Sequence, residues 1–385
     1  MTAATAVRLV GLVRSHMLPE VNILRFSGAV SGALFVVSGL LAAFVPAPAA
    51  AQTGEPIKIG YSMALSGGLA ANGRSALLAQ KIWEEDTNAR GGLLGHPVKL
   101  IYYDDQTNPA TVPGIYTKLL DVDKVDLIIG PYGTNVLSPA MPIAMQRKKV
   151  FIGLLGAAVN STFNYPNYFS MIPLGPDPKT SFTKGFVDLA MRQNPKPQTV
   201  AIVAADAEFG LNACEGARSN VKAAGLTVVY DRRYPPATTD LAPVVRAIAE
   251  TNPDLVIVCS YPPDSVGMVR AVNEVGFKPK MIGGAMVGLQ STAIKARLGP
   301  LLNGWTNYDY WLPVPKMEFP GVKDLMTRYQ ARAAAEGVDP LITWHHGATP
   351  SCRLSSKRSR APRASMTPSS AITSALTRSR PWSAT

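Results

Sequence analysis

Hydroxyl groups and glycine-rich turns follow several short apolar runs of this chain, and they could bind an anion. In GPYGTN, Gly130–Asn135, Tyr132 and Thr134 stand at the expected start of a helix, where a hydroxyl and free backbone N–H groups can hold a carboxylate. Thr134 could also be an ordinary N-cap, and both roles are compatible. A second turn, LSGGLAANG at Leu65–Gly73, lacks the GK[ST] ending of a phosphate loop. It is therefore either an anion-binding turn or a plain tight turn.

Three further segments offer candidate contacts for a ligand. The small residues of GAAVNST, Gly156–Thr162, would let a ligand approach the backbone. AADAEFG supplies Asp206 and Phe209, and CSYPPD supplies Tyr261. A tyrosine at the end of a strand can be a ligand contact or a packed aromatic with a solvated hydroxyl. The residues alone leave both roles of Tyr261 open.

The chain carries no pattern that supports catalysis. HExxH, GxSxG and a phosphate-loop lysine are all absent from the sequence. His96, in an expected turn, is most simply a solvated surface residue. The paired acids Asp104 and Asp105 follow a strand, so their side chains point to opposite faces, which favours capping of the adjoining loop over metal or acid/base chemistry. We therefore expect no enzyme, no metal site and no cofactor.

The elements that must position these residues follow one repeated pattern. From Ile57 onward, short apolar runs alternate with amphipathic stretches, which is typical of a doubly wound parallel sheet. The first set of expected strands is Ile57–Met63, Val98–Tyr103, Leu127–Gly130 and Val150–Leu154, with helices at Ser75–Asn88, Pro113–Leu120 and Leu137–Gln146. The second set is Val200–Ala204, Thr227–Tyr230, Leu255–Cys259 and Met281–Gly283, with helices at Phe209–Ala224, Leu241–Thr251 and Ser265–Val275. Two such sheets form two lobes, and ligands bind at the carboxyl ends of their strands.

Composition fits a two-lobed globule and disfavours a nucleic-acid partner. The 385 residues are 47% hydrophobic and 17% charged, with a net charge of +12. Most of that excess lies in residues 1–51 and 342–385, so the body between them has no basic field.

The amino terminus has the pattern of an export signal. Arginines precede the uncharged run Phe26–Val45, and small residues then lead to Ala51. We expect a signal peptide over residues 1–51, cleaved near Ala51, and hence an exported protein. The alternative is a retained membrane anchor, since the run is about long enough to span a bilayer.

Cysteine spacing gives little guidance. Cys214, Cys259 and Cys352 match neither a metal site nor a CxxC motif, and their number is odd. We expect Cys214, on a helix, and Cys259, at a strand end, to be small buried packing residues. A bridge between cysteines is the lesser alternative.

One segment resembles the signature of a known family. NARGGLLGHPVKLIYYDD, Asn88–Asp105, joins a helix end, a glycine turn, a buried strand and an acidic strand tip. It resembles the leucine-binding type (type I) of periplasmic solute-binding proteins, the capture subunits of amino-acid ABC importers, and the likeness extends over Ile57–Leu341. The resemblance implies an α/β fold of two doubly wound parallel-sheet lobes joined by a hinge. Lobe 1 would span residues 55–173, lobe 2 residues 174–308, and residues 309–341 would return to lobe 1.

The resemblance also implies roles for single residues. Positions matching Thr134 and the small residues Gly156, Ala157 and Ala158 hold the ligand carboxylate in that family, and the position matching Tyr261 closes the second lobe over it. Where the family has an aromatic residue in its first loop, this chain has Asn72.

The family's acidic partner for a ligand ammonium group is missing, because Ala285 and Met286 stand in its region. An ammonium group buried without a partner would be costly. We therefore expect an aromatic acid, an amide or another carboxylate rather than leucine, unless Asp206 or Asp264 compensates.

The tail, residues 342–385, is basic and of low complexity. It could be a disordered linker. Alternatively, allowed codons for Trp344–Ser355 and Pro362–Ser374, read one base earlier, can spell helix-like sequences typical of the family's carboxyl end. We therefore hypothesise a frameshift near Leu341 that truncates the return to lobe 1, and sequencing the coding DNA tests it.

Together these features predict the periplasmic substrate-binding component of an ABC importer for amino acids or related carboxylate, amide or aromatic-acid ligands. Its partners would be a small molecule and an inner-membrane permease. The alternative is a ligand-sensing regulator of the amide-responsive type on the same fold, against which the export signal argues. The candidate ligand-binding residues are Asn72, Tyr132, Thr134, Gly156, Ala157, Ala158, Asp206, Phe209, Tyr261 and Met286.

Overall fold

The computed structural model of the chain describes residues 54–340, apart from residues 173, 176, 237, 310–313 and 319. The expected signal peptide at residues 1–51, the tail at residues 342–385 and the hypothesis of a frameshift near Leu341 lie outside the described residues. No helix within the described part of the chain is both long and apolar enough to span a bilayer.

The first lobe is built on a parallel five-stranded sheet with the order β2-β1-β3-β4-β5. Tyr61 and Met63 of β1 are fully buried, as expected of a strand covered by helices on both faces. Its strands are β1 Ile57–Met63, β2 Val98–Asp104, β3 Leu127–Ile129, β4 Phe151–Gly153 and β5 Tyr168–Ser170. Its helices are α1 Ala70–Ala89, α2 Val112–Asp121, α3 Thr134–Leu137, η2 Ser138–Ala140, α4 Met141–Gln146 and α5 Asn160–Phe163.

The second lobe repeats the plan, with a parallel sheet of order β10-β9-β8-β6-β7. Every residue of its central strand β8 is buried. Its strands are β6 Thr199–Ala205, β7 Thr227–Tyr234, β8 Leu255–Ser260, β9 Met281–Met286 and β10 Trp305–Asn307. The helices are α6 Pro178–Ala190, α7 Glu208–Ala223, α8 Ala242–Glu250, α9 Pro262–Val275, η3 Val287–Gln290, α10 Thr292–Leu298 and η4 Gly299–Leu302, followed later by η5 Pro315–Met317.

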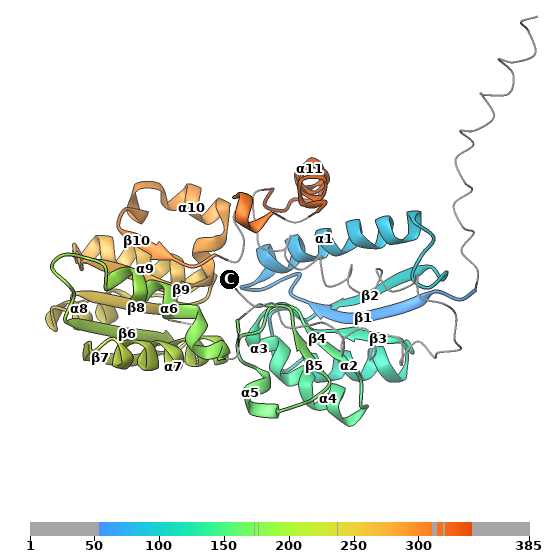
Figure 1. Cartoon of the computed structure of the whole chain (residues 1–385), viewed down its shortest axis with the longest axis horizontal. Helices are drawn as coiled ribbons and strands as arrows, with labels where there is room; N and C mark the ends of the chain where they lie inside the picture. Colours follow the sequence, from blue (N-terminus) through green and yellow to red (C-terminus); the bar gives the residue numbers. More distant parts are fainter. Residues whose placement is uncertain are drawn as a thin grey trace, which may run out of the picture. The chain divides into compact units, whose positions relative to one another are not determined.

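The two sheets share one topology (Figure 1). In each, the second strand in sequence lies outside the first, and the third, fourth and fifth follow on the other side of the first. The winding direction therefore reverses between β1 and β3 and between β6 and β8, and such switch points are where ligands bind. The predicted α/β fold of two doubly wound parallel-sheet lobes is confirmed.

The last described helix packs on the first lobe. Helix α11, Val322–Ala333, lies beside α1 in Figure 1. Leu325 and Tyr329 form a small core with Leu78 and Ile82. Arg328 forms an ion pair with Asp86 across the same contact. The chain thus crosses back to the first lobe after β10.

A disulfide joins Cys214 in α7 to Cys259 in β8, with an S–S distance of 2.10 Å and a Cα–Cα distance of 6.1 Å. Both residues are fully buried, as expected. The expectation that they are unpaired packing residues is wrong, because α7 packs on β8 and brings the two side chains together.

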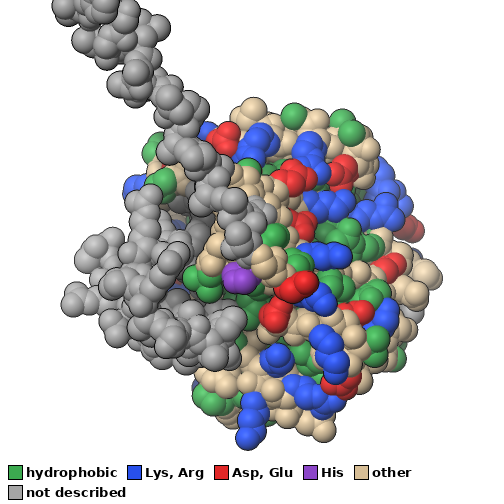
Figure 2. Space-filling model, turned by 90° about the vertical axis from the view of Figure 1, so that its right-hand side faces the viewer, with side chains coloured by type: hydrophobic (Ala, Val, Ile, Leu, Met, Phe, Trp, Pro, Cys, Tyr) green, Lys and Arg blue, Asp and Glu red, His purple; other side chains and the backbone are tan. Residues whose placement is uncertain are grey.

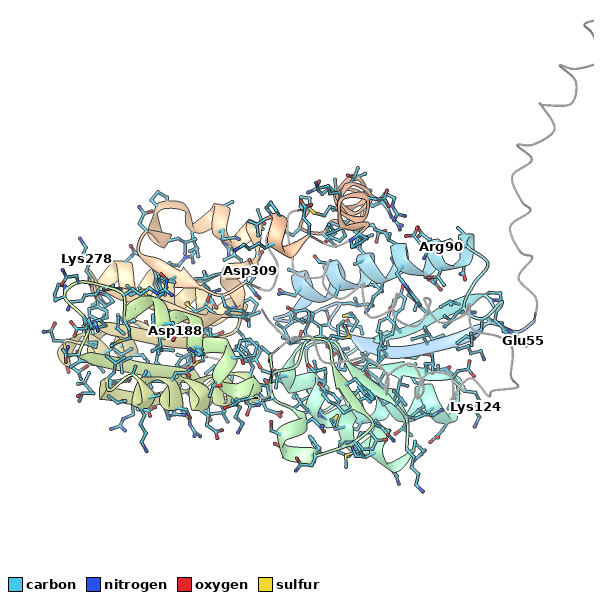
Figure 3. The ribbon with its side chains drawn as sticks, viewed as in Figure 1. Glu55, Arg90, Lys124, Asp188, Lys278 and Asp309 are labelled. Atoms are coloured by element: carbon cyan, nitrogen blue, oxygen red, sulfur yellow. A yellow bond between two sulfur atoms is a disulfide. The ribbon has the colours of Figure 1, made fainter. Side chains whose placement is uncertain are left out.

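The surface carries charges of both signs. Figure 2 shows Lys and Arg side chains interspersed with Asp and Glu over the described part of one face. In Figure 3, Lys278 lies at the outer end of the second lobe, and Glu55 and Lys124 lie at the outer end of the first.

Candidate functional site

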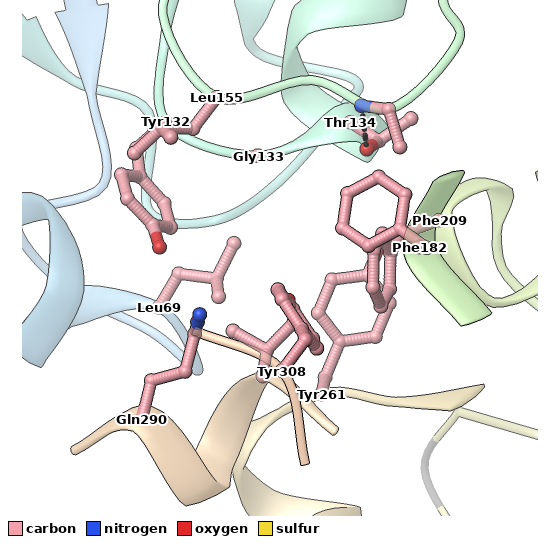
Figure 4. Close-up of a pocket in the computed structure, with 12 residues that line it drawn as sticks. Leu69, Tyr132, Gly133, Thr134, Leu155, Phe182, Phe209, Tyr261, Gln290 and Tyr308 are labelled. Atoms are coloured by element: carbon pink, nitrogen blue, oxygen red, sulfur yellow. Dashed lines mark hydrogen bonds between the residues drawn. The ribbon is translucent and has the colours of Figure 1, made fainter. Parts of the chain in front are cut away.

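A small pocket lies between the two lobes, where the carboxyl ends of the strands of one sheet face those of the other (Figure 4). Every loop that reaches it from the first lobe follows a strand: β1, β3 or β4. The first-lobe residues that line it are Leu69, Tyr132, Gly133, Thr134, Leu155 and Ala157. The second-lobe residues that line it are Phe182, Phe209, Tyr261, Val287, Gln290 and Tyr308.

Thr134 provides a buried hydroxyl on the first-lobe side. Its Oγ1 atom accepts a hydrogen bond of 2.9 Å from the backbone N–H of Ala157. A hydroxyl that accepts a hydrogen bond still has one proton to donate. The N-cap position of α3 belongs to Gly133, whose φ of 104° suits glycine, so Thr134 is not the N-cap. The hydroxyl of Thr134 therefore links two loops of the first lobe at the pocket wall.

Tyr132 and Asn72 form a second polar group of the first lobe. The Nδ2 atom of Asn72 donates a hydrogen bond of 3.1 Å to the hydroxyl of Tyr132. Asn72 is buried within α1 and does not line the pocket; Leu69 lines it from the first loop instead. Asn72 thus reaches the pocket only through Tyr132.

Aromatic side chains fill the second-lobe side. The ring of Phe182 packs edge-on against Phe209 and against Tyr308, with centroid distances of 5.4 and 5.2 Å. The rings of Phe209 and Tyr261 lie 5.6 Å apart. These rings leave a cavity volume of only about 20 Å³, roughly the room for one water molecule.

Asn135 connects the two lobes beside the pocket. Its Oδ1 atom accepts a hydrogen bond of 3.1 Å from the backbone N–H of Phe209 and another from the hydroxyl of Tyr261. Close by, the Nδ2 atom of Asn212 donates a hydrogen bond of 3.1 Å to the carbonyl of Ala157. Hydrogen bonds between the lobes therefore accompany the apolar packing beside the pocket.

The pocket wall is electrically neutral, since none of its lining residues has a charged side chain. Two carboxyl groups, those of Asp264 and Glu208, lie close to lining residues but do not line the pocket themselves. Asp264 accepts hydrogen bonds from the backbone N–H of Tyr261 at 2.9 Å and from the hydroxyl of Tyr234 at 2.5 Å. Burial raises the pKa of Asp264 to about 6. Burial also raises the pKa of Glu208, which is hydrogen-bonded to the side chain of Ser138.

Four other predicted residues stand outside the pocket lining. Asp206 is half-exposed and faces Arg233 at 3.6 Å. Met286 is fully buried in the core of the second lobe. Gly156 packs against Leu137 and Val159, and neighbouring Ala158 is buried. The structure therefore gathers five of the predicted residues at the pocket: Tyr132, Thr134, Ala157, Phe209 and Tyr261.

The acids at the end of β2 shape the adjoining loop. Asp104 accepts hydrogen bonds from the backbone N–H groups of Leu65 and Ser66, and Asp105 accepts one from the hydroxyl of Ser62. The predicted capping role is confirmed. Among the residues described, no group of three or more His, Cys, Asp or Glu side chains is placed to hold a metal ion.

A family model and a curated relative both match this chain to periplasmic binding proteins. A family model described as "Periplasmic binding protein" matches residues 56–347. The Leu/Ile/Val-binding protein homolog 8 of Brucella abortus (strain 2308) is 28% identical over 295 residues, which cover 73% of this chain and 71% of the relative.

Two solved structures share the fold. A solute-binding protein of an ABC transporter from R. palustris, in complex with 4-hydroxybenzoate, superposes with a TM-score of 0.66 at 23% identity, covering 78% of this chain and 79% of that one. The branched-chain amino acid transporter substrate-binding protein LivJ from Streptococcus pneumoniae, in complex with isoleucine, has a TM-score of 0.66 at 17% identity, covering 84% and 88%.

Proposed function

Because this chain belongs to the periplasmic binding protein family, and is thus a solute-binding protein rather than an enzyme, we propose that it captures a small carboxylate outside the cytoplasm for an ABC importer. The carboxylate has an apolar or aromatic body and no ammonium group. The permease of the importer, in the inner membrane, receives the closed, loaded form.

One observation carries the choice of ligand class: the pocket is neutral and lined by aromatic rings, with a hydroxyl at one side. A buried ammonium group needs a carboxylate partner, because its desolvation is otherwise uncompensated. Neither Asp206 nor Asp264 lines the pocket, so neither supplies that partner. A carboxylate, in contrast, can accept a hydrogen bond from the hydroxyl of Thr134, and the rings can enclose an aromatic body.

The ligand of the R. palustris protein fits this description, because 4-hydroxybenzoate is an aromatic acid without an amine. Isoleucine, the ligand of the S. pneumoniae protein, carries an ammonium group. The neutral, aromatic lining of the pocket therefore supports the proposal of an aromatic acid as the ligand.

Binding requires the lobes to move. A cavity of about 20 Å³ is smaller than any aromatic acid, so a ligand enters only when the two aromatic and polar walls separate. The lobes then close by a hinge motion, and contacts to both walls favour the closed state. In this proposal Tyr132, Thr134 and Ala157 hold the ligand from the first lobe, and Phe209 and Tyr261 cover it from the second.

The disulfide between Cys214 and Cys259 supports an oxidising location. Together with the expected signal peptide it favours the periplasm. It disfavours the alternative, an amide-responsive regulator, because the cytoplasm keeps thiols reduced.

Isothermal titration of the protein purified from the periplasm of an expressing bacterium tests the proposal. We expect benzoate to bind and leucine to give no heat of binding. Thr134→Val should weaken benzoate binding about tenfold or more, because a hydrogen bond to a charged group is lost. Thr117→Val, which removes an exposed hydroxyl on α2, is the matched control and should change nothing. Tight leucine binding with no benzoate binding would overturn the proposed ligand class.

A further inference from the structure

One polar side chain of the pocket, that of Gln290, is buried without hydrogen-bond partners. Gln290 is only 2% exposed, and neither its Oε1 nor its Nε2 atom has a hydrogen-bond partner among the residues described. Buried amides are nearly always hydrogen-bonded, because leaving the donor and acceptor unmet is costly. The side chain lines the pocket, so a bound molecule is the natural source of the missing partners.

The backbone that carries Gln290 is firmly held. It ends η3, the turn that follows β9, and this turn packs closely on α9. A Cβ atom at Gly288 would lie 2.7 Å from Ser265, so the turn can approach α9 only with glycine there. Immediately after it, the backbone N–H of Thr292 donates a hydrogen bond of 2.7 Å to Asp339. Contacts on both sides of Gln290 therefore fix its backbone, as is required of a residue that determines ligand specificity.

Gln290 and Thr134 lie on opposite sides of the pocket. In Figure 4, Thr134 stands on one side, Gln290 on the other, and the rings of Phe209, Tyr261 and Tyr308 come between them. The hydroxyl of Tyr132 lies on the same side of the view as the amide of Gln290. A ligand whose carboxylate meets Thr134 would thus direct its other end to the amide.

We propose that Gln290 selects ligands with a neutral polar group, a hydroxyl or a carboxamide, at the end opposite the carboxylate. This inference rests on the proposed function. An amide presents one acceptor oxygen and two N–H donors, and a hydroxyl or carboxamide both donates and accepts, so both halves of the amide are satisfied. A second carboxylate could satisfy only the Nε2 donors and would leave the Oε1 atom facing a negative charge. An ammonium group could satisfy only Oε1.

The test compares two acids that differ in a single hydroxyl. Isothermal titration of the wild-type protein with 4-hydroxybenzoate and with benzoate should show a preference of about tenfold or more for the hydroxylated acid, because the unsubstituted acid leaves the amide unpaired. Gln290→Met keeps the length of the side chain and removes both polar atoms. It should reduce the preference to less than about threefold while benzoate affinity stays nearly constant.

Gln80→Met is the matched control, since Gln80 is another buried glutamine, on α1, and does not line the pocket. It should leave the preference unchanged. If Gln290→Met does not fold, Gln290→Leu repeats the measurement with a second apolar side chain.

The outcomes separate the two proposals. If the wild-type protein binds neither acid, the proposed aromatic-acid function fails and takes this inference with it. If it binds both acids equally, or if the Gln290 variants keep the preference for the hydroxylated acid, the function stands and the role of Gln290 is wrong.

Discussion

The hydroxyl of Tyr261, in the second lobe, donates a hydrogen bond to the Oδ1 atom of Asn135, in the first. The same oxygen accepts a hydrogen bond from the backbone N–H of Phe209. One side-chain atom of the first lobe therefore accepts hydrogen bonds from two pocket residues of the second lobe. These bonds can form only while the lobes are in contact.

Tyr261→Phe should weaken ligand binding about fivefold. The ring and its packing against Phe209 remain, but the closed state loses one hydrogen bond, worth about 1 kcal/mol. Isothermal titration with benzoate gives the affinity, and small-angle X-ray scattering reports whether the free protein is more open. Tyr103→Phe is the control, because it removes a tyrosine hydrogen bond to Asp123 within the first lobe. An unchanged affinity in Tyr261→Phe would show that this contact does not bias closure.

Gln290→Met should stabilise the free protein by about 1 kcal/mol. The substitution removes an amide whose two polar atoms are buried without partners, so the folded state no longer bears their desolvation cost. Urea unfolding without ligand measures the change. A loss of stability would mean that the amide has partners in the folded protein, and it would contradict the unpaired state seen here.

The fold was largely predictable from the sequence, because central strands of a parallel sheet are continuous apolar runs. Ile57–Met63 was predicted to the residue as β1. The three-residue strands β5 and β10 were missed, because Ser170, Thr306 and Asn307 leave them without the apolar run that marks the equally short β3 and β4. Helix α6 was missed although Asp177 and Pro178 mark its start and its buried residues follow a helical spacing.

The candidate site was predictable only in part, because one helix was missed and the ends of two other elements were misplaced. Phe182 was missed together with its helix α6. The strand expected to end at Gly283 continues to Met286, so Met286 lies in the sheet. Gln290, in the turn after the strand, lines the pocket instead. Helix α1 begins five residues earlier than expected, at Ala70, because Gly73 lets it approach the carbonyl of Ala64. Asn72 is consequently a helix residue behind the pocket.

Reduction of the disulfide should lower the free energy of unfolding by about 4 kcal/mol. Cys214 and Cys259 are 45 residues apart, and the bond restricts the unfolded chain by the entropy of closing that loop. Urea unfolding with and without dithiothreitol measures the difference. The double variant Cys214→Ala/Cys259→Ala is the control, since its unfolding should not respond to the reductant. Equal stability of oxidised and reduced wild-type protein would contradict the expected role of the bridge.

Asp264 should make the protein less stable as the pH rises from about 4 to about 6. Burial raises the pKa of its carboxyl group from 3.8 to about 6 in the folded state. Between these values the unfolded chain has released the proton while the folded protein still holds it, so raising the pH favours unfolding. The loss should reach about 3 kcal/mol and then stay constant above pH 6.

Asp264→Asn should abolish this dependence. The amide can still accept from the backbone N–H of Tyr261 and can donate to the hydroxyl of Tyr234, but it carries no charge at any pH. The unfolding free energy of the variant minus that of the wild-type protein should therefore increase between pH 4 and pH 6, as measured by urea unfolding. Asp188→Asn is the control, because Asp188 is exposed and its ion pair with Lys184 is worth about 0.5 kcal/mol at most. A difference between Asp264→Asn and wild type that stays flat over this range would show that the carboxyl group of Asp264 is ionised in the folded protein at pH 4.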